Sequence, residues 1–384
     1  MSVIRFARES LLTDAFDVVV VGAGIAGCAC AHELADAGVQ VAVVERDAPG
    51  GGATAAGMGH IVVMDDSPAQ LALTHYARSL WQKLTSELPA SVEYEERGTL
   101  WIAADHEEMT QVHTKHATCT GAGVRSEVLD AVALSEAEPR LRTGLAGALL
   151  VPDDAILYPP AAARYLLQAA QRAGARLIRG TVTRAGNGAV TLSDGTMLAS
   201  DHIVIATGVE VSMFPWIRLK KRKGHLVITD RYPGFVRHQL VELGYLKSAH
   251  ATTSDSVAFN VQPRMTGQLL IGSSRQYMQE DVPADAGVVD SMLRRAYEYM
   301  PQLASLSATR VWTGFRAATS DKLPLIGPTH DPTLYMLAGF EGLGITMAPA
   351  AARLLADHLL ARQSAIDPGP YLPERMARAE TILV

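Results

Sequence analysis

The chain has 384 residues, of which 48% are hydrophobic and 19% charged, and its formal net charge is -6 at pH 7. A chain of this length can bury a large core and is expected to form about two domains. The mild and dispersed negative charge argues against a general nucleic-acid binder, because affinity for phosphate needs concentrated Lys and Arg.

The sequence carries no targeting, membrane or metal signal that we recognise. Residues 1–16 include charged side chains and lack the apolar core of a signal peptide, and no run of about eighteen uncharged apolar residues could span a membrane. Cys28, Cys30 and Cys119 form neither an even disulfide set nor a zinc-binding spacing. We therefore expect a cytoplasmic, reduced protein with no membrane span and no metal site.

The first predicted elements form a βαβ unit. Residues 17–22 (DVVVVG) suit a strand buried on both faces, residues 24–37 suit a helix, and residues 39–45 (VQVAVVE) suit a second buried strand. Two such strands joined by a helix imply a parallel sheet with a right-handed crossover.

The later elements alternate in the same way and then become mainly strand-like. Residues 80–141 are more polar and less regular, and residues 216–313 alternate as strands do. In chain order, the clearer elements are a helix at 160–173, extended chain at 175–184, a hairpin at 189–198, a buried strand at 202–206 and a last helix at 344–361.

The expected fold class is α/β with α+β character. We expect a Rossmann-type nucleotide-binding domain into which a sheet-rich substrate domain is inserted. The expected segments are 1–80, 142–215 and 314–384 for the nucleotide-binding domain, and 81–141 and 216–313 for the substrate domain.

Residues 22–27 (GAGIAG) match the GxGxxG pattern of dinucleotide-binding folds. The match follows a strand and opens a helix, and Glu45 ends the next strand roughly twenty residues later. Gly22 permits the tight turn, Gly24 lets the backbone approach a pyrophosphate, and Gly27 lets helix and strand pack closely. Amides at the helix N-terminus would bind the phosphates, and Glu45 would bind the ribose hydroxyls. The alternative, an ordinary Gly-rich turn with a solvated Glu45, is disfavoured because all three elements are in register.

Residues 50–60 (GGGATAAGMGH) favour FAD over NAD as the dinucleotide. A run this rich in glycine suits a backbone that must lie against a bound cofactor. A surface loop is the alternative, but a long flexible loop would more often contain Lys, Glu or Pro. A second phosphate and flavin contact is therefore the better interpretation.

Two C-terminal segments bear on a flavin ring. Residues 314–328 contain Arg316 among small and apolar residues, and a buried Arg needs a carboxylate partner, either internal or from a substrate. Residues 338–349 form a Gly-rich turn into the last helix, whose positive end would stabilise an anionic reduced flavin at its N1–C2=O edge. A plain helix N-terminus packed on the sheet is an equally good interpretation from the residues alone.

Together these segments resemble the D-amino-acid-oxidase family of FAD-dependent amine oxidoreductases, which includes glycine oxidase, sarcosine oxidase and D-amino-acid dehydrogenases. The resemblance covers nearly the whole chain and implies that Arg316 binds a substrate carboxylate. It also implies that FAD is bound by Gly22, Gly24, Ile25, Ala26, Gly27, Glu45, Arg46, Ala53, Thr54, Gly57, Met58, Gly59, Val182, Ala206, Thr207, Gly208, Gly314, Gly342, Leu343, Gly344, Ile345 and Thr346.

The sequence departs from the family pattern at three points. Gly342 stands where glycine oxidase has a second Arg, so the residues that bind the substrate carboxylate are expected to differ. Residues 314–327 contain no Cys, so a non-covalent FAD is expected. Gly57 replaces the usual Asn in the loop after the first glycine cluster.

Residues 218–231 (RLKKRKGHLVITDR), 262–264 and 272–276 resemble the β subunits of multi-subunit dye-linked dehydrogenases, which oxidise opines, proline or hydroxy-D-proline. This resemblance implies a partner subunit carrying FMN, FAD or an iron–sulfur centre. The basic residues 220–223 would fit such an electron-transfer partner, but a solvated strand end explains them at least as well.

The implied activity is hydride transfer to FAD from the carbon next to nitrogen in a carboxylate-bearing amine. Arg316 would hold the carboxylate so that the reacting C–H lies about 3–3.5 Å from the flavin. His60, His225, Tyr245 and Phe259 are expected to shape the pocket, the two histidines by packing rather than as acids or bases.

The substrate and the electron acceptor stay open. The substrates under consideration are glycine, sarcosine, a D-amino acid, an opine and hydroxy-D-proline, and we favour a dehydrogenase of a cyclic or N-substituted amino acid over a peroxide-producing oxidase. Other classes are a flavin-carrying electron-transfer or structural subunit, an NAD-dependent dehydrogenase, and a tRNA-modifying flavoprotein, which the acidic charge balance disfavours.

Overall fold

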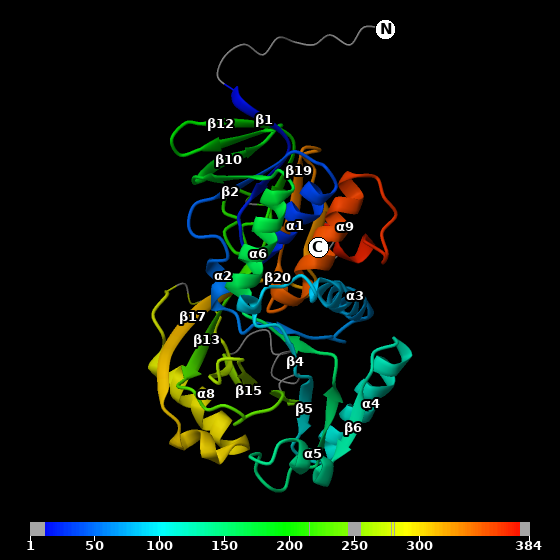
Figure 1. Cartoon of the computed structure of the whole chain (residues 1–384), viewed down its shortest axis with the longest axis vertical. Coiled ribbons are helices and arrows are strands. Elements are labelled where there is room, and N and C mark those ends of the chain that lie inside the picture. Colours follow the sequence, from blue (N-terminus) through cyan, green and yellow to red (C-terminus); the bar gives the residue numbers. More distant parts are fainter. Residues whose placement is uncertain (1–11, 215, 245–254, 278, 280, 377–384) are drawn as a thin grey trace, which may run out of the picture.

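The computed structural model describes residues 12–214, 216–244, 255–277, 279 and 281–376. In Figure 1 a first sheet and its helices occupy the upper half, and a second sheet occupies the lower half. Within these residues, the helices are too short or too polar to cross a membrane.

The first sheet is built around the predicted βαβ unit. Strand β1 pairs in parallel with β2 and β12, and β12 pairs in parallel with β19. The described strands are β10 (Val182–Gly186), β11 (Ala189–Leu192), β12 (Met197–Ile205), β1 (Leu12–Val21), β2 (Val41–Glu45) and β9 (Arg176–Arg179) in spatial order, with β19 (Leu334–Ala338) beside β12 and β18 (Leu325–Pro328) beside β19.

Both faces of this sheet are buried, as the apolar runs predict. Val18 and Val20 of β1 lie in the cluster that contains the helices, whereas Val19 and Val21 lie in the cluster on the opposite face, because successive side chains of a strand alternate. The helices that pack together on the first face are α1 (Ile25–Asp36), α6 (Pro159–Arg172), α9 (Gly344–Leu359) and α3 (Pro68–Leu84).

The second sheet draws its strands from distant parts of the chain. Its described order is β20 (Phe340–Glu341), β17 (Ala308–Ala318), β13 (Lys220–Thr229), β16 (Leu269–Arg275), β15 (Ser256–Pro263), β14 (Gln239–Glu242), β5 (Thr99–Ala103), β7 (Gly147–Val151) and β6 (Glu127–Asp130). Helix α8 (Ala286–Tyr299) packs on β15 and β16, and α4 (His106–Gly121) and α5 (Ala131–Ala137) pack at β7.

Smaller elements complete the described fold. They are a three-stranded sheet of β3 (His60–Ile61), β8 (Ala155–Ile156) and β4 (Glu95–Glu96), the short helix α2 (Gly52–Ala56), and the 3₁₀ turns η1 (Ala90–Val92), η2 (Pro301–Ser305) and η3 (Gly369–Tyr371).

Three sequence-based expectations about the elements need correction. Residues 216–313 are not all strand-like, because they include helix α8. The Gly-rich run at 50–60 is not wholly a loop, since part of it forms α2. Residues 80–141, expected to be irregular, hold α4 and β5.

The two sheets also divide the chain differently from the expected domain boundaries. Strand β7 and the last residues of β17, which the boundaries at 142 and 314 assign to the nucleotide-binding domain, are paired within the second sheet. We therefore propose that one domain is built on the first sheet and the other on the second sheet.

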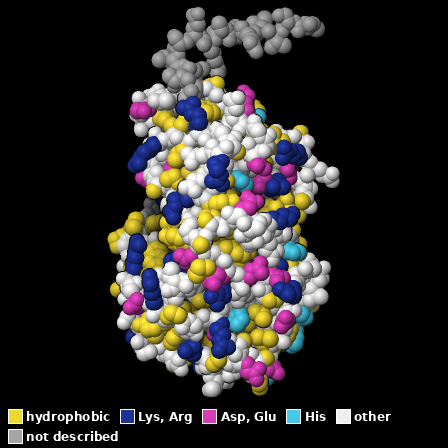
Figure 2. Space-filling view, in the orientation of Figure 1, with side chains coloured by type: hydrophobic (Ala, Val, Ile, Leu, Met, Phe, Trp, Pro, Cys, Tyr) yellow, Lys and Arg dark blue, Asp and Glu magenta, His cyan; other side chains and the backbone are white. Residues whose placement is uncertain are grey.

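The basic run at 220–223 is only partly a solvated strand end, because Lys220 is exposed and Lys221 half-buried, whereas the next two residues are buried. Lys223 is fully buried, and its Nζ donates to Asp281 Oδ1 (3.1 Å) and to the Pro283 carbonyl oxygen (2.6 Å). Arg222 is buried as well and pairs with Glu341 at 2.9 Å. On the face of the molecule drawn in Figure 2, Lys and Arg side chains are scattered among Asp and Glu rather than gathered into one basic surface.

Candidate active site

A cavity of about 470 Å³ is lined by residues of both large sheets. At one end it is bordered by Gly22, Glu45 and Ala206, which lie at the carboxyl ends of β1, β2 and β12. At the other end it is bordered by the second sheet, through residues such as Asn260 and Arg316. Parallel α/β sheets bind ligands at the carboxyl ends of their strands, so this cavity is the candidate active site.

The turn between β1 and α1 is shaped by the close approach of two backbones. Gly22 has φ +105°, and a Cβ at this position would lie 2.6 Å from the Ala206 carbonyl oxygen. The turn is fastened to the end of β2, because the Ala23 amide donates to Glu45 Oε2 at 2.7 Å. The glycine pattern and the acidic residue predicted from the sequence therefore lie together.

The first turn of α1 offers backbone amides to the cavity. Helix α1 has no N-cap side chain of its own and no acidic residue in its first turn, and the Glu45 carboxylate lies beside its N-terminus through the Ala23 amide. Thr54 crosses from α2 to this turn, and its Oγ1 accepts a hydrogen bond from the Ile25 amide at 3.0 Å.

Most of the residues predicted to bind a dinucleotide line the cavity. They are Gly22, Gly24, Ile25, Ala26, Glu45, Arg46, Ala53, Thr54, Gly57, Met58, Val182, Ala206, Thr207, Gly208, Gly314, Gly342, Leu343, Gly344 and Ile345. Arg46 borders it with an exposed side chain that pairs with Asp47.

The other three predicted binding residues do not line the cavity and act as structural supports. A Cβ at Gly27 would lie 2.0 Å from the Gly22 carbonyl oxygen, and one at Gly59 would lie 1.9 Å from the Leu157 carbonyl oxygen. Thr346 is fully buried, and its Oγ1 donates to the His60 carbonyl oxygen at 3.0 Å. These residues hold neighbouring segments in place.

The N-terminus of α9 also borders the cavity. This helix also lacks a side-chain N-cap and an acidic residue in its first turn. A Cβ at Gly57 would lie 2.8 Å from Ile345 Cδ1, and one at Gly314 would lie 2.4 Å from Ala56 Cβ. Glycine thus lets α2, α9 and β17 meet around the cavity.

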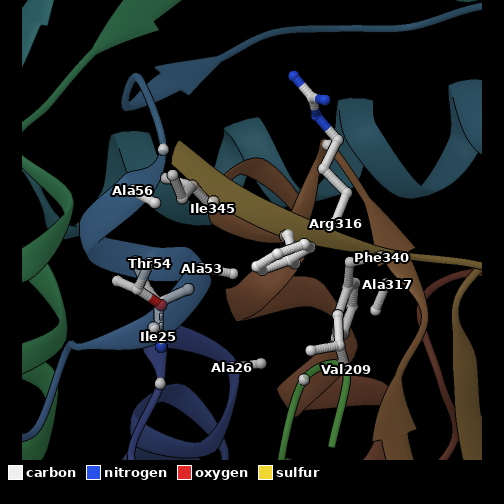
Figure 3. Close-up of a pocket in the computed structure, with 18 of the residues that line it drawn as sticks. Ile25, Ala26, Ala53, Thr54, Ala56, Val209, Arg316, Ala317, Phe340 and Ile345 are labelled. Atoms are coloured by element: carbon white, nitrogen blue, oxygen red, sulfur yellow. Dashed lines mark hydrogen bonds between the residues drawn. The ribbon is translucent and has the colours of Figure 1, made fainter. Parts of the chain in front are cut away.

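Arg316 lies at the far end of the cavity from α1. Its Nη1 donates to the Ser274 carbonyl oxygen at 2.9 Å. In Figure 3 its side chain extends away from Ile25 and Ala26. A Cβ at Gly224 would lie only 2.6 Å from Nη1, and one at Gly342 would lie 3.5 Å from Nε, so two glycines leave space around the guanidinium.

A second charged cluster borders the same region and was not predicted. Glu341 belongs to β20, which pairs with β17. Its carboxylate lies 2.9 Å from Arg222 Nη1 and 4.0 Å from Arg275 Nε. All three side chains line the cavity. Arg222 lies opposite Arg316 in the pairing of β13 with β17. The available signal in the sequence was its position in a predicted strand, two residues before Gly224.

The two predicted histidines differ in how they are held. His225 is fully buried; its Nε2 accepts from the Asp285 amide at 3.0 Å and its Nδ1 lies 2.9 Å from Ser274 Oγ. Burial and the nearby Lys223 lower its pKa. Both ring nitrogens are therefore used within the protein, which agrees with a packing role.

His60 borders the cavity between the β3 strand and α9. Its Nδ1 is buried and has no hydrogen-bond partner among the described residues. Burial lowers the pKa of His60 to about 4; a hydrogen bond with the Gly342 backbone opposes this shift, and the charge of Arg316 adds to it. The ring is therefore neutral at pH 7.

Of the two predicted aromatic residues, only Phe259 lies in the described part of the chain, and it does not line the cavity. Phe259 is fully buried on the opposite face of the second sheet and stacks on Tyr299 of α8, with ring centroids 4.6 Å apart. Its prediction as a pocket residue is wrong, because it belongs to the core beneath α8. Tyr245 lies outside the described residues.

Three polar residues of the second sheet line the cavity and escaped prediction. They are Gln239 of β14, Asn260 of β15 and Ser273 of β16. The available signal was a polar residue within a strand that is otherwise apolar, as in the sequence around Asn260, but such a residue is usually explained by solvent exposure.

The sequence matches the family model described as "FAD dependent oxidoreductase" over residues 17–358. The chain belongs to this family. It is an FAD-dependent oxidoreductase, and the alternative of an NAD-dependent dehydrogenase is set aside.

Relatives within the family cover nearly the whole chain. The glycine oxidase of Pseudomonas aeruginosa is 29% identical over 384 residues, covering 93% of this chain and 98% of that protein. The crystal structure of glycine oxidase from Geobacillus kaustophilus has a TM-score of 0.82 at 26% identity, covering 94% and 98% of the two chains. L-Proline dehydrogenase from P. horikoshii shares the fold, with a TM-score of 0.85 at 23% identity and coverage of 96% and 99%.

The cavity fits FAD. The first turn of α1, where Gly24 and Ala26 line the cavity, is suited to its pyrophosphate, and Glu45, at the carboxyl end of β2, is suited to its adenosine ribose. The uncapped N-terminus of α9 at Gly344 lies at the end of the cavity nearer Arg316, where the positive end of a helix would stabilise negative charge on a reduced flavin.

Gly22→Ala is expected to release FAD. The new Cβ would meet the Ala206 carbonyl oxygen and move the α1 amides, and each 1.4 kcal/mol of interaction lost weakens binding about tenfold. We expect the Kd for FAD, measured by titrating apoprotein, to rise about tenfold or more. The matched control is Gly38→Ala, where φ is also positive at +83° but no described heavy atom lies within 4 Å of the new Cβ. Equal losses in the two variants would contradict a specific role for the Gly22 turn.

His60 predicts a pH dependence of stability. Its folded pKa, about 4, lies below its unfolded value of about 6.5, so between these values the unfolded state binds more protons. Stability is therefore lost as pH falls through this window, by up to about 1.4 kcal/mol per pH unit. Denaturant unfolding of wild type and His60→Gln at pH 4.5–7 should show curves that diverge, with the steeper loss in the wild type. Parallel curves would contradict a neutral, buried His60.

Proposed function

We propose that this chain oxidises the C–N bond of an amino acid. The observation that carries the proposal is Arg316, whose guanidinium borders the cavity in a space left by Gly224 and Gly342. A planar guanidinium is well suited to binding a carboxylate through two parallel hydrogen bonds. The glycine oxidases among the relatives support an amino acid as substrate.

The chain's own residues would bind and orient the substrate. Arg316 would hold the carboxylate and thereby fix the reacting carbon relative to the cofactor. When bound, FAD supplies a two-electron acceptor for the hydride of the C–H bond next to nitrogen, while the nitrogen loses a proton and the product is an imine.

No strong base is needed at this site. His60 is neutral, and His225 has both ring nitrogens engaged by the protein. The arginines at the cavity would instead lower the pKa of a substrate ammonium, because a like charge disfavours the protonated form. The amine would then be oxidised in its neutral form.

The finer assignment follows the sequence. We propose a dehydrogenase for a cyclic or N-substituted amino acid with non-covalently bound FAD, and a partner subunit carrying FMN, FAD or an iron–sulfur centre as its electron acceptor. The basic run at 220–223 gives little support to the partner, because Arg222 and Lys223 are buried. Location in the cytoplasm stays a prediction.

Arg316→Met should abolish most of the activity while keeping the cofactor. Losing one partner of a buried charge pair costs about 2–5 kcal/mol, so we expect kcat/KM to fall about a hundredfold or more, with normal FAD content and normal reduction by dithionite. The measurement is anaerobic bleaching of the flavin by glycine, sarcosine, D-alanine and D-proline.

The matched control is Arg310→Met on the same strand. Arg310 is exposed and lies over the Trp312 ring, with the guanidinium carbon 5.6 Å from the ring centroid, and it does not line the cavity. We expect its variant to keep wild-type activity. Unchanged turnover by Arg316→Met with the best substrate would contradict the carboxylate role.

Reoxidation in air separates a dehydrogenase from an oxidase. The enzyme reduced by its amino acid should reoxidise slowly with oxygen and rapidly with an artificial dye, if electrons normally pass to another protein. Stopped-flow absorbance measures both rates. Rapid reoxidation with one peroxide formed per turnover would assign the chain as an oxidase and remove the need for a partner subunit.

A further inference from the structure

A group of polar side chains at the second-sheet end of the cavity is not used by the proposed oxidation. Gln239, Asn260 and Ser273 line the cavity and are 3%, 8% and 4% exposed. Among the described residues, Gln239 Oε1, Asn260 Oδ1 and Ser273 Oγ find no hydrogen-bond partner. Buried polar atoms in folded proteins are nearly always paired, and an exception calls for an explanation.

The sheet register brings Gln239 and Asn260 together, and Ser273 borders the same cavity. Asn260 of β15 lies opposite Val241 of β14 and opposite Gly272 of β16. Gln239 is two residues from Val241 on the same face of β14, and Ser273 directly follows Gly272. Diagonal side chains are about 7–8 Å apart at Cβ, so one small ligand group can lie between Gln239 and Asn260, and Ser273 borders the same cavity from the neighbouring strand.

Two neighbouring polar side chains take part in hydrogen bonds within the protein. On the adjacent position of β15, the Gln262 amide nitrogen donates to the Met58 carbonyl oxygen at 2.8 Å. On β16, Ser274 Oγ accepts from the His225 amide at 2.9 Å. Gln262 Oε1 also finds no hydrogen-bond partner among the described residues, but Gln262 does not line the cavity, whereas Gln239, Asn260 and Ser273 do.

The chemistry of the three side chains selects the kind of ligand group. Their oxygens accept hydrogen bonds, and the two amides and the hydroxyl can also donate. A hydroxyl or carboxamide on the ligand can satisfy both needs, whereas an alkyl group would leave every one of these atoms unpaired. An ammonium is disfavoured because Arg222, Arg275 and Arg316 border the same cavity with Glu341 as their described counter-charge.

We propose that the enzyme selects amino acids whose side chain or ring carries a hydroxyl or carboxamide, read by Gln239, Asn260 and Ser273. This inference rests on the proposed function and narrows its substrate class. Arg316 binds the carboxylate, and the polar triad binds the distal group. The walls between them are apolar, formed by Met58, Leu226 and Val241, and suit the carbon skeleton.

The test compares substrates that differ only in the distal group. The probes are hydroxyproline against proline, threonine against valine and asparagine against leucine, each as both enantiomers, with aspartate as the carboxylate probe. Anaerobic flavin reduction by the holoenzyme gives kcat/KM for each. A site built to bind a substrate hydroxyl rejects the analogue lacking it by about 10⁴–10⁵-fold. We therefore expect at least one hydroxyl- or carboxamide-bearing probe to have a kcat/KM at least about tenfold higher than its apolar partner.

Variants decide whether the triad causes the preference. Asn260→Leu and Ser273→Ala should each bring the ratio of kcat/KM for the polar and the apolar probe of a pair to within about threefold of one. The value should fall for the polar probe only, because the apolar probe loses no hydrogen bond. Ser273→Ala is the smaller change, so it still tests the inference if Asn260→Leu does not fold. The control is Thr266→Val in the turn between β15 and β16, which does not line the cavity and should keep the preference.

Each result is decisive. Equal rates for paired probes, a faster apolar member, or a preference that survives both triad variants would overturn the inference while leaving amino-acid oxidation intact. Aspartate as the best probe would assign the site to a second carboxylate and overturn it as well. If no amino acid reduces the flavin although dithionite does, the proposed function itself fails, and the inference fails with it.

Discussion

The N-termini of α1 and α9 face one cavity because the strands that precede them are parallel. Strand β1 pairs with β12, and β12 pairs with β19, all in the same direction. Helix α1 follows β1, and α9 follows β19 through the short strand β20. Their amino ends therefore meet at the carboxyl edge of the sheet, where uncapped amides can bind the anionic parts of FAD. The rest of the site is arranged around these two positive ends.

The local part of this arrangement could be predicted from the sequence, and the long-range part could not. The strand, the Gly22 turn and α1 are consecutive in the chain, so spacing alone defines them. The contact of Gly57 with Ile345 and that of Gly314 with Ala56 join distant segments. A single sequence shows that glycine occurs at these positions but not which atom excludes a side chain there.

The second sheet shows why the substrate end of the cavity was harder to predict. Phe259 and Asn260 are adjacent on β15, and alternation places one beneath α8 and the other at the cavity. Without a correct position for α8, an aromatic residue in a strand suits either face. The start of α8 was nevertheless marked, because Asp285 Oδ1 accepts from the amides of Gly287 and Val288 as an N-cap does.

The charges around the cavity connect substrate binding to the chemistry. Glu341 is held by Arg222 at 2.9 Å, and Arg316 adds a further positive charge near the N-terminus of α9. The charge of Arg316 also helps to keep His60 neutral. A carboxylate is attracted to such a site, whereas an ammonium on the same substrate is repelled and loses its proton more easily. One cationic environment would thus bind the acid group, deliver the amine in its oxidisable neutral form and stabilise the negative charge that the reduced cofactor acquires.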